Sequence, residues 1–187
     1  MSGEFRTGRK YAQHFYPDDV ARAGVTGPTG PGGATGPAGP QGPGGGGLVS
    51  SFANFFTLAG SIAPVANNAP MPFSTNGPAG GAAVTRAGAS TTTFTINTTG
   101  NYEVTWQVDV NEPGQLQLAL NGAGLPDTVV GRATGTSQIY GSTVISATAG
   151  QTLTVLNVSG GALTLTPPSG SLTHAISATL TVKLLSP

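Results

Sequence analysis

The sequence predicts an all-β protein whose largest part, residues 48–187, folds as a β-sandwich of the jelly-roll type. Apolar and polar residues alternate with a period of two in several short stretches of this region, which is the pattern of half-buried strands. Turn-forming residues separate these stretches, and no stretch has a convincing helical period. Many short antiparallel strands within about 140 residues favour a sandwich.

Residues 1–23 form a tail that is too short to build a core. The tail holds seven of the fourteen charged residues and four of the eleven Phe and Tyr residues of the chain. It is either a disordered or partly vector-derived segment, or an anchoring peptide that orders on a partner protein or a neighbouring subunit. Aromatic and arginine residues are the usual anchors of such contacts. The candidate anchoring residues are Phe5, Arg6, Arg9, Lys10, Tyr11, Phe15 and Tyr16.

Residues 24–47 repeat a Gly-X-Y triplet. Glycine stands at every third position from Gly24 to Gly45, through eight triplets. Only glycine fits at the crowded axis where three polyproline-type chains wind together, whereas a flexible linker has no reason to keep glycine in phase. We therefore predict a collagen-like triple-helical stem of about 70 Å, ending in a hinge at Gly44–Gly47.

The third position of the triplets carries threonine rather than proline. Thr26, Thr29 and Thr35 occupy this position in three triplets, and proline never does. Animal collagens place hydroxyproline there, so this stem is not expected to depend on prolyl hydroxylation, which favours a bacterial or viral source. Such a short stem is marginal by itself, so another part of the chain must bring three copies together.

The clearest predicted strand is "NYEVTWQVDVN", residues 101–111. One of its faces is apolar, and Trp106 lies on that face, so we interpret this residue as part of the core and not as a carbohydrate platform. Further alternation predicts strands at Phe94 and Ile96, at Leu116, Leu118 and Leu120, at Leu163 and Leu165, and at Ile176, Ala178, Leu180, Val182 and Leu184. Turns are expected at Thr99–Asn101, Glu112–Gly114, Asn121–Gly122, Ala149–Gly150 and Pro167–Gly170.

The predicted sandwich has very few charged residues for its size. Only seven lie beyond residue 47: Arg86, Glu103, Asp109, Glu112, Asp127, Arg132 and Lys183. A soluble domain that stands alone usually carries more charge, so part of this surface is expected to be buried between subunits. A threefold assembly would bury it, and the collagen register independently requires three chains.

Composition excludes several classes of function. The net charge is zero, which argues against electrostatic binding of nucleic acid or anionic lipid. The chain has no cysteine, so disulfides, thiol catalysis and thiolate metal sites are excluded. No apolar run is long enough to span a bilayer, and the N-terminus lacks the apolar core of a secretory signal. A protein assembled inside a mother cell or an infected host would need no such signal.

Residues with catalytic or ligand-binding chemistry are sparse. His14 could join Asp18 and Asp19 in a cation site, but a flexible tail has no preorganised geometry. His174 is interpreted as the start of a strand. Asp109, Glu112 and Asp127 could contribute to a calcium site, although ordinary solvated acids are the favoured interpretation. We expect neither catalysis nor a cofactor, and any ligand site is expected in loops at the end of the domain far from the stem, such as 122–132 or 134–140.

Two Asn-X-Ser/Thr sequons begin at Asn97 and Asn157. Such sequons are acceptor sites for N-linked sugars in secreted proteins. In a bacterial protein they carry little weight.

Several segments together carry a family resemblance. These are the Gly-Pro-Thr triplets, "PMPFSTNG" (70–77), "FTINTTGNYEVTWQVDV" (94–110), "LALNGAGLP" (118–126) and "AISATLTVKLL" (175–185). A short collagen-like stretch followed by an all-β domain with these features resembles the BclA-like collagen-like proteins of the bacterial spore surface, the exosporium glycoproteins. The resemblance implies a homotrimeric C1q/TNF-like jelly-roll head, and O-linked sugars on Thr26, Thr29 and Thr35.

The chain departs from that family in two respects. Eight triplets are far fewer than usual, which suggests a short tether, and residues 1–23 do not closely match the family's leader. The tail is therefore expected to fix the protein to an anchor protein of the spore exterior or of a spore appendage. The alternatives are a phage tail-fibre tip, which also combines collagen-like tracts with trimeric β heads, and a lectin-like binding module. An enzyme ranks last.

Overall fold

The computed structural model describes residues 24, 26–34, 36, 49–58, 63–135, 137–166 and 175–187. The chain divides into two units, Met1–Gln41 and Gly42–Pro187. The candidate anchoring residues of the tail, Thr35, and both histidines lie outside the described residues. No helix in the described part of the chain is long and apolar enough to cross a membrane.

The described residues of the Gly-X-Y tract are exposed and belong to no strand or helix. Thr26 and Thr29 are among these exposed residues. At Gly24, Gly27 and Gly30 a Cβ atom would meet no other heavy atom within 4 Å, and the same holds at Gly33 and Gly36. Contacts within one chain therefore give no reason for glycine at every third position.

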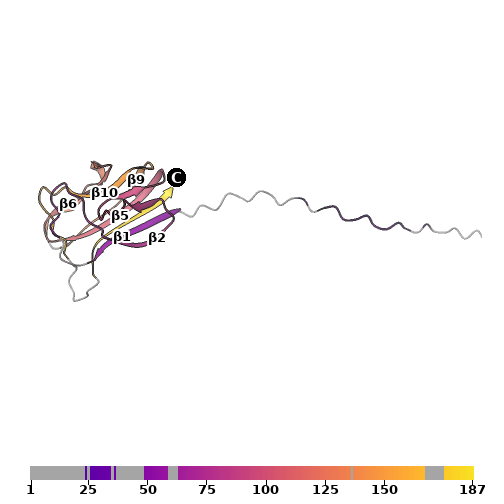
Figure 1. Cartoon of the computed structure of the whole chain (residues 1–187), viewed down its shortest axis with the longest axis horizontal. Helices are drawn as coiled ribbons and strands as arrows, with labels where there is room; N and C mark the ends of the chain where they lie inside the picture. Colours follow the sequence, from indigo (N-terminus) through magenta and orange to yellow (C-terminus); the bar gives the residue numbers. More distant parts are fainter. Residues whose placement is uncertain are drawn as a thin grey trace, which may run out of the picture. The chain divides into compact units, whose positions relative to one another are not determined.

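The second unit is an all-β sandwich of two antiparallel sheets (Figure 1), which we call the head. The first sheet has the strand order β2-β1-β11-β5-β9, and the second has the order β3-β4-β10-β6-β7, with β8 also paired to β6. The strands are β1 (Ser51–Leu58), β2 (Thr75–Gly80), β3 (Val84–Arg86), β4 (Phe94–Ile96), β5 (Gly100–Val110), β6 (Gly114–Leu120), β7 (Ala123–Gly124), β8 (Val130–Arg132), β9 (Ser137–Ala147), β10 (Thr152–Asn157) and β11 (Ile176–Ser186). One short 3₁₀ helix, η1 (Pro126–Thr128), interrupts the described strands.

The core confirms the predicted inward face of β5. Tyr102, Val104, Trp106, Val108 and Val110 are all buried, and so are the predicted apolar residues of β4 and β6. The strands predicted at Phe94 and Ile96 and at Leu116, Leu118 and Leu120 are present as β4 and β6. Leu163 and Leu165 are buried as expected, but each forms only an isolated bridge, to Val65 and Val110 respectively.

Strand β11 confirms the last predicted strand, except at its first residue. Ala178, Leu180, Val182 and Leu184 are buried, whereas Ile176 is 43% exposed. The pairing between β1 and β11 shifts register between Thr57 and Leu58, and Leu58 then pairs with Ile176. Because a register shift changes which face a residue joins, the alternation breaks at this end of the strand.

The turn at Asn121–Gly122 is confirmed, because both residues have positive φ, 51° and 78°. Gly100 and Gly114 have a different role from the turns predicted around them, since each begins a strand. A Cβ on Gly100 would meet the carbonyl oxygen of Ser186, and a Cβ on Gly114 would meet the side chain of Leu163. Close packing therefore explains glycine at both positions.

The two termini of the head lie at one end of the sandwich. The N–H of Ser50 donates to the carbonyl of Leu184 (3.0 Å), and β1 and β11 run side by side from this end (Figure 1). Because β5 pairs its first residues with Ala147 and Ser186, its last residues lie at the opposite end. We call this opposite end the distal end.

Candidate interaction surfaces

The side of the first sheet that faces away from the second sheet is here called the sheet face. Most of the exposed large apolar residues of the described chain lie on its strands. These residues are Phe52 and Leu58 on β1, Tyr140 and Val144 on β9, and Ile176 on β11; the others are Val49 and Val129. The second sheet contributes none of them.

Strand β9 supplies the most exposed of these side chains. Tyr140 is 59% exposed and Val144 is 58% exposed, while Ile139 and Ile145, which have the opposite parity, are buried in the core. Alternation along β9 therefore places apolar side chains on both faces of the strand. An apolar row of this kind on an outer face is typical of a surface that another protein covers.

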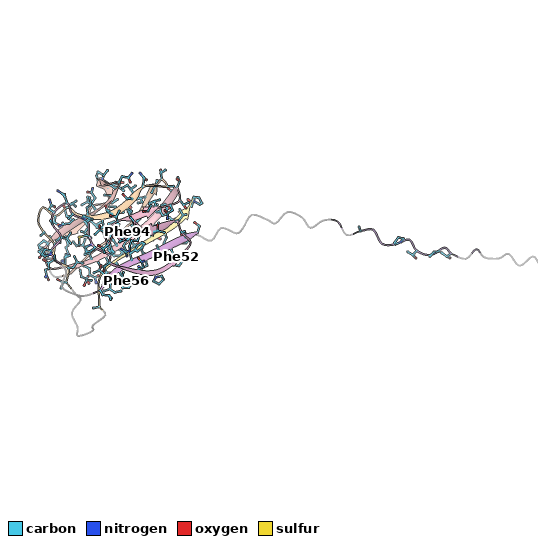
Figure 2. All side chains as sticks on the ribbon, in the orientation of Figure 1. Phe52, Phe56 and Phe94 are labelled. Atoms are coloured by element: carbon cyan, nitrogen blue, oxygen red, sulfur yellow. The ribbon has the colours of Figure 1, made fainter. Side chains whose placement is uncertain are left out.

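Strand β1 supplies the second apolar row. Phe52 and Phe56 alternate with the buried Ala53 and Phe55, and Figure 2 labels both phenylalanines along this strand. Leu58 lies beside its cross-strand partner Ile176. The sheet face thus carries two apolar rows, one on β1 and one on β9, with β11 and β5 between them.

Between the two rows the sheet face is polar and almost uncharged. The Asn54 amide donates to the hydroxyls of Thr179 (3.1 Å) and Thr181 (2.9 Å). Lys183 and Glu103 form a half-exposed ion pair at 3.0 Å, and such a pair contributes little stability at a solvated surface. The polar groups therefore satisfy one another, and this strip presents little net charge to a partner.

A charged cluster lies at the distal end. Arg132 donates to the backbone carbonyls of Val110 and Glu112, while a carboxylate oxygen of Glu112 accepts from the N–H of Thr164 at 2.7 Å. Asp109 was predicted on the polar face of its strand, but it is only 6% exposed. Its backbone carbonyl accepts from Thr166, so the chain segment after Leu163 packs against this end of β5.

The pKa values of the two carboxylates in the cluster, Asp109 and Glu112, are shifted in opposite directions. Burial raises the pKa of Asp109, and the side chain of Gln107 and the positive charge of Arg132 oppose this rise without cancelling it. Burial alone would also raise the pKa of Glu112, but the hydrogen bonds from Thr164 and the charge of Arg132 bring it below its ordinary value. The cluster has the character of a structural network.

The structure does not bring together the three acids that could have contributed to a calcium site. Asp109 and Glu112 lie at the distal end of β5, whereas Asp127 is exposed in η1, which follows β7 and is held to the middle of β6. Within the described ranges, no three His, Cys, Asp or Glu side chains form a group able to hold a metal ion.

The two sequon asparagines have different surroundings. Asn97 is exposed, whereas Asn157 is fully buried. The Asn157 amide donates to the carbonyls of Val65 and Gly161, both at 2.9 Å, and accepts from the N–H of Ser159 at 3.0 Å. Asn157 is therefore a structural residue that joins two loops and is closed to glycosylation in the folded head.

The predicted ligand loops lie only partly at the distal end. Arg132 and the start of the segment 134–140 lie at the distal end. The turn at Asn121–Gly122 lies at the other end of β6. A shallow groove beside β8 is lined by Gln115, Val129, Gly131, Arg132 and Ala133.

Sequence reasoning missed the two apolar rows of the sheet face. The signal available for them was apolar residues at both parities in "SFANFFTL" and "QIYGSTVIS".

An all-β sandwich of two antiparallel sheets with this strand order is a C1q/TNF-like jelly-roll head. The globular domain of zebrafish complement 1qA has the same fold, with a TM-score of 0.53 and 12% identity over 73% of this chain and 98% of that chain. The TNF protein Eiger from S. frugiperda matches with a TM-score of 0.53 and 14% identity over 72% of this chain and 92% of its own. Murine APRIL matches with a TM-score of 0.51 and 16% identity over 72% and 98%.

The family is shown by the sequence. The family described as the BclA C-terminal domain matches residues 52–185, which begin one residue inside β1 and end one residue before the end of β11. The chain therefore belongs to the BclA C-terminal domain family, as its resemblance to the BclA-like proteins predicted. Among curated proteins, none matches this chain.

Proposed function

We propose that this chain is a structural protein of the bacterial spore surface, in which three heads assemble on a collagen-like stem and the N-terminal tail fixes the assembly to the exosporium or to a spore appendage. Its membership of the BclA C-terminal domain family supports the spore surface as its location. The proposed domains are the tail at 1–23, the stem at 24–47 and the head at 48–187. Its role is reach and attachment, with no catalytic step.

The main support for the proposed trimer is the sheet face. A ring of identical subunits needs two different surfaces on each chain, because every contact is head-to-tail. The two apolar rows, on β1 and on β9, provide two such surfaces, and the polar strip between them carries one self-paired ion pair. Burial of the rows contributes roughly 25 cal/mol per Å² of apolar surface, which is free energy that the stem lacks.

The Gly-X-Y tract is a second observation in favour of three chains. Glycine recurs in strict phase through the tract, yet a Cβ at the described triplet glycines would meet nothing within the chain. The phase is explained when two further chains pack against these positions, as in a triple helix. Thr26 and Thr29 are exposed, so these two threonines are accessible for the proposed O-linked sugars; Thr35 is the third proposed acceptor.

The tail completes the proposal. Phe5, Arg6, Arg9, Lys10, Tyr11, Phe15 and Tyr16 are the residues proposed to contact the anchor protein. Replacing the four aromatic residues of this set by Ser should release the protein from spores without altering the mass of the assembly. Retention of the substituted protein on spores would contradict this part of the proposal.

Two measurements test the whole proposal. Native mass spectrometry of the full chain should give three copies, and immunogold labelling should decorate the spore exterior or its appendages. A monomer or dimer at micromolar concentration would overturn the assembly. Label on phage particles released from the same cells, with none on spores, would instead support the tail-fibre alternative.

A further inference from the structure

Strand β1 is the first strand of the head after the Gly-X-Y tract, so a pull on the proposed stem reaches the head through this strand. Every residue of β1 from Ser51 to Leu58 has a partner on β11. The opposite edge of β1 pairs with β2 from Phe52 to Phe56. The strand is therefore held by backbone ladders on both sides, and it runs along the length of the sandwich (Figure 1).

Side-chain hydrogen bonds also fasten β1 at its start and at its end. At the start, the Ser51 hydroxyl donates to the Gly80 carbonyl (2.8 Å) and accepts from the Ala83 N–H (3.2 Å). At the end, the Thr57 hydroxyl donates to the Pro72 carbonyl (2.8 Å) and accepts from the Ser74 N–H (3.0 Å). These bonds resist movement of β1 along its own axis.

A third fastening lies in the middle of the strand. The Asn54 amide reaches β11, where it donates to the hydroxyls of Thr179 and Thr181. On its other side the same amide covers Gly77 of β2, where a Cβ would collide with the Asn54 oxygen. Asn54 therefore spans three strands of the sheet, and Gly77 provides the space that it needs.

From these contacts we infer that β1 transmits mechanical tension between the stem and the distal end of the head. The inference rests on the proposed role of the chain as a surface tether. A pull from residue 49 towards the distal end acts parallel to β1, so the bonds of both ladders and the three fastenings share the load. A pull from residue 49 against the C-terminus, which lies at the same end, opens the β1–β11 ladder one pair at a time from Ser51 and Leu184.

Single-molecule force spectroscopy on the full chain separates the two directions. The chain has no cysteine, so thiol handles can be placed freely at exposed positions. Val49→Cys with Pro113→Cys, in the distal turn between β5 and β6, loads β1 along its axis; Val49→Cys with Pro187→Cys peels β1 from β11. At equal loading rates we expect a higher rupture force for the first pair. Equal or lower force for the first pair would overturn the inference.

Asn54→Ala tests the middle fastening, and Asn97→Ala is its matched control. The Asn97 amide donates to the Ala82 carbonyl (2.8 Å) and the Thr85 hydroxyl (3.0 Å), and neither of these partners belongs to β1. Asn54→Ala should lower the rupture force of the Val49–Pro113 pair, and Asn97→Ala should leave it unchanged. Equal losses in both variants would contradict a special role for β1.

This test is independent of where the protein resides. Rupture forces are measured on purified chains, whereas the spore-surface function depends on native mass and labelling. A protein that labels spores but shows no directional difference in force would retain the proposed function and lose this inference. Native mass spectrometry of Asn54→Ala accompanies the experiment, because Asn54 lies on the sheet face, and an unchanged mass assigns the loss of force to β1.

Discussion

Trp106 on β5 and Gly141 on β9 are cross-strand partners, and the indole ring of Trp106 fills the space that a Cβ on residue 141 would occupy. Glycine is therefore required at this point of β9 so that the largest side chain of the core can lie against the backbone. The pair joins β9, which carries one apolar row of the proposed subunit interface, to the centre of the sandwich.

Gly141→Ala should destabilise the head. The added methyl group must displace the Trp106 ring, and overpacking of this kind costs about 1–3 kcal/mol. Chemical denaturation followed by tryptophan fluorescence measures the loss, since Trp106 is the only tryptophan. Gly161→Ala is the matched control, because a Cβ there meets nothing within 4 Å. Equal stability of the two variants would contradict the packing described for Trp106.

Asn157→Ala should also destabilise the head, through the loss of three hydrogen bonds. The substitution removes the bonds of the amide with the carbonyls of Val65 and Gly161 and with the N–H of Ser159, and each lost hydrogen bond costs about 0.5–1.5 kcal/mol. Thermal unfolding at a fixed protein concentration measures the effect. The exposed Asn97→Ala provides the comparison, and an equal shift in both would refute a structural role specific to Asn157.

Asp109→Asn should stabilise the head at neutral pH. The pKa of Asp109 is raised from its ordinary value of 3.8 in the folded state, so the unfolded chain releases this proton first as the pH rises. The contribution of Asp109 to the stability of the head is therefore fully present below pH 3.8, and it is lost as the pH rises through the pKa of the folded state. The variant should unfold at a higher temperature than the parent at pH 7, and the difference should vanish near pH 3. The exposed Asp127→Asn is the control.

Glu112→Gln should have the opposite dependence on pH. The pKa of Glu112 is lowered from 4.5 in the folded state, so its contribution to stability is present above 4.5 and is lost as the pH falls through the folded pKa. The variant should unfold at a lower temperature than the parent at pH 7 and should match it in acid. A pH-independent difference would show that lost packing, and not charge, causes the effect.

Val144→Lys should dissociate the assembly. Val144 is 58% exposed on the β9 row of the sheet face. A lysine there would place a further charge in the proposed interface, beside the Glu103–Lys183 pair, and charges are costly to bury. Sedimentation should show smaller species at concentrations where the parent is trimeric, and circular dichroism should show loss of the triple-helical signal. Ala162→Lys, at an exposed loop position, should leave both unchanged.

Strands with polar residues on one face could be predicted from the sequence, and strands with apolar residues on both faces could not. The inward residues of β5 and β11 follow from alternation alone. In β9, however, Tyr140 and Val144 on one face alternate with Ile139 and Ile145 on the other, so no period of two is visible. β10 has the same difficulty, because Leu153, Thr154 and Val155 are all buried.

The burial of Asp109 shows a second limit of local patterns. Its position in the alternation of β5 places it on the solvent side, with Gln107 and Thr105. The distal end of this strand is paired with the segment around Leu165, which is far away in the sequence. A contact of this kind depends on the path of the chain, so the residues that neighbour Asp109 in the sequence do not indicate that it is buried.

Three features can be predicted from residue order alone: the glycine phase of the stem, the core face of β5 and the low charge of the head. These features depend only on residue type and on spacing over a few positions along the chain. The tertiary structure was needed to show that the rows of Phe52 and Tyr140 lie on one sheet face, and that the first strand after the Gly-X-Y tract is paired on both edges. Strand order depends on which segments pair across long stretches of chain, and that choice is made by the packing of the whole sandwich.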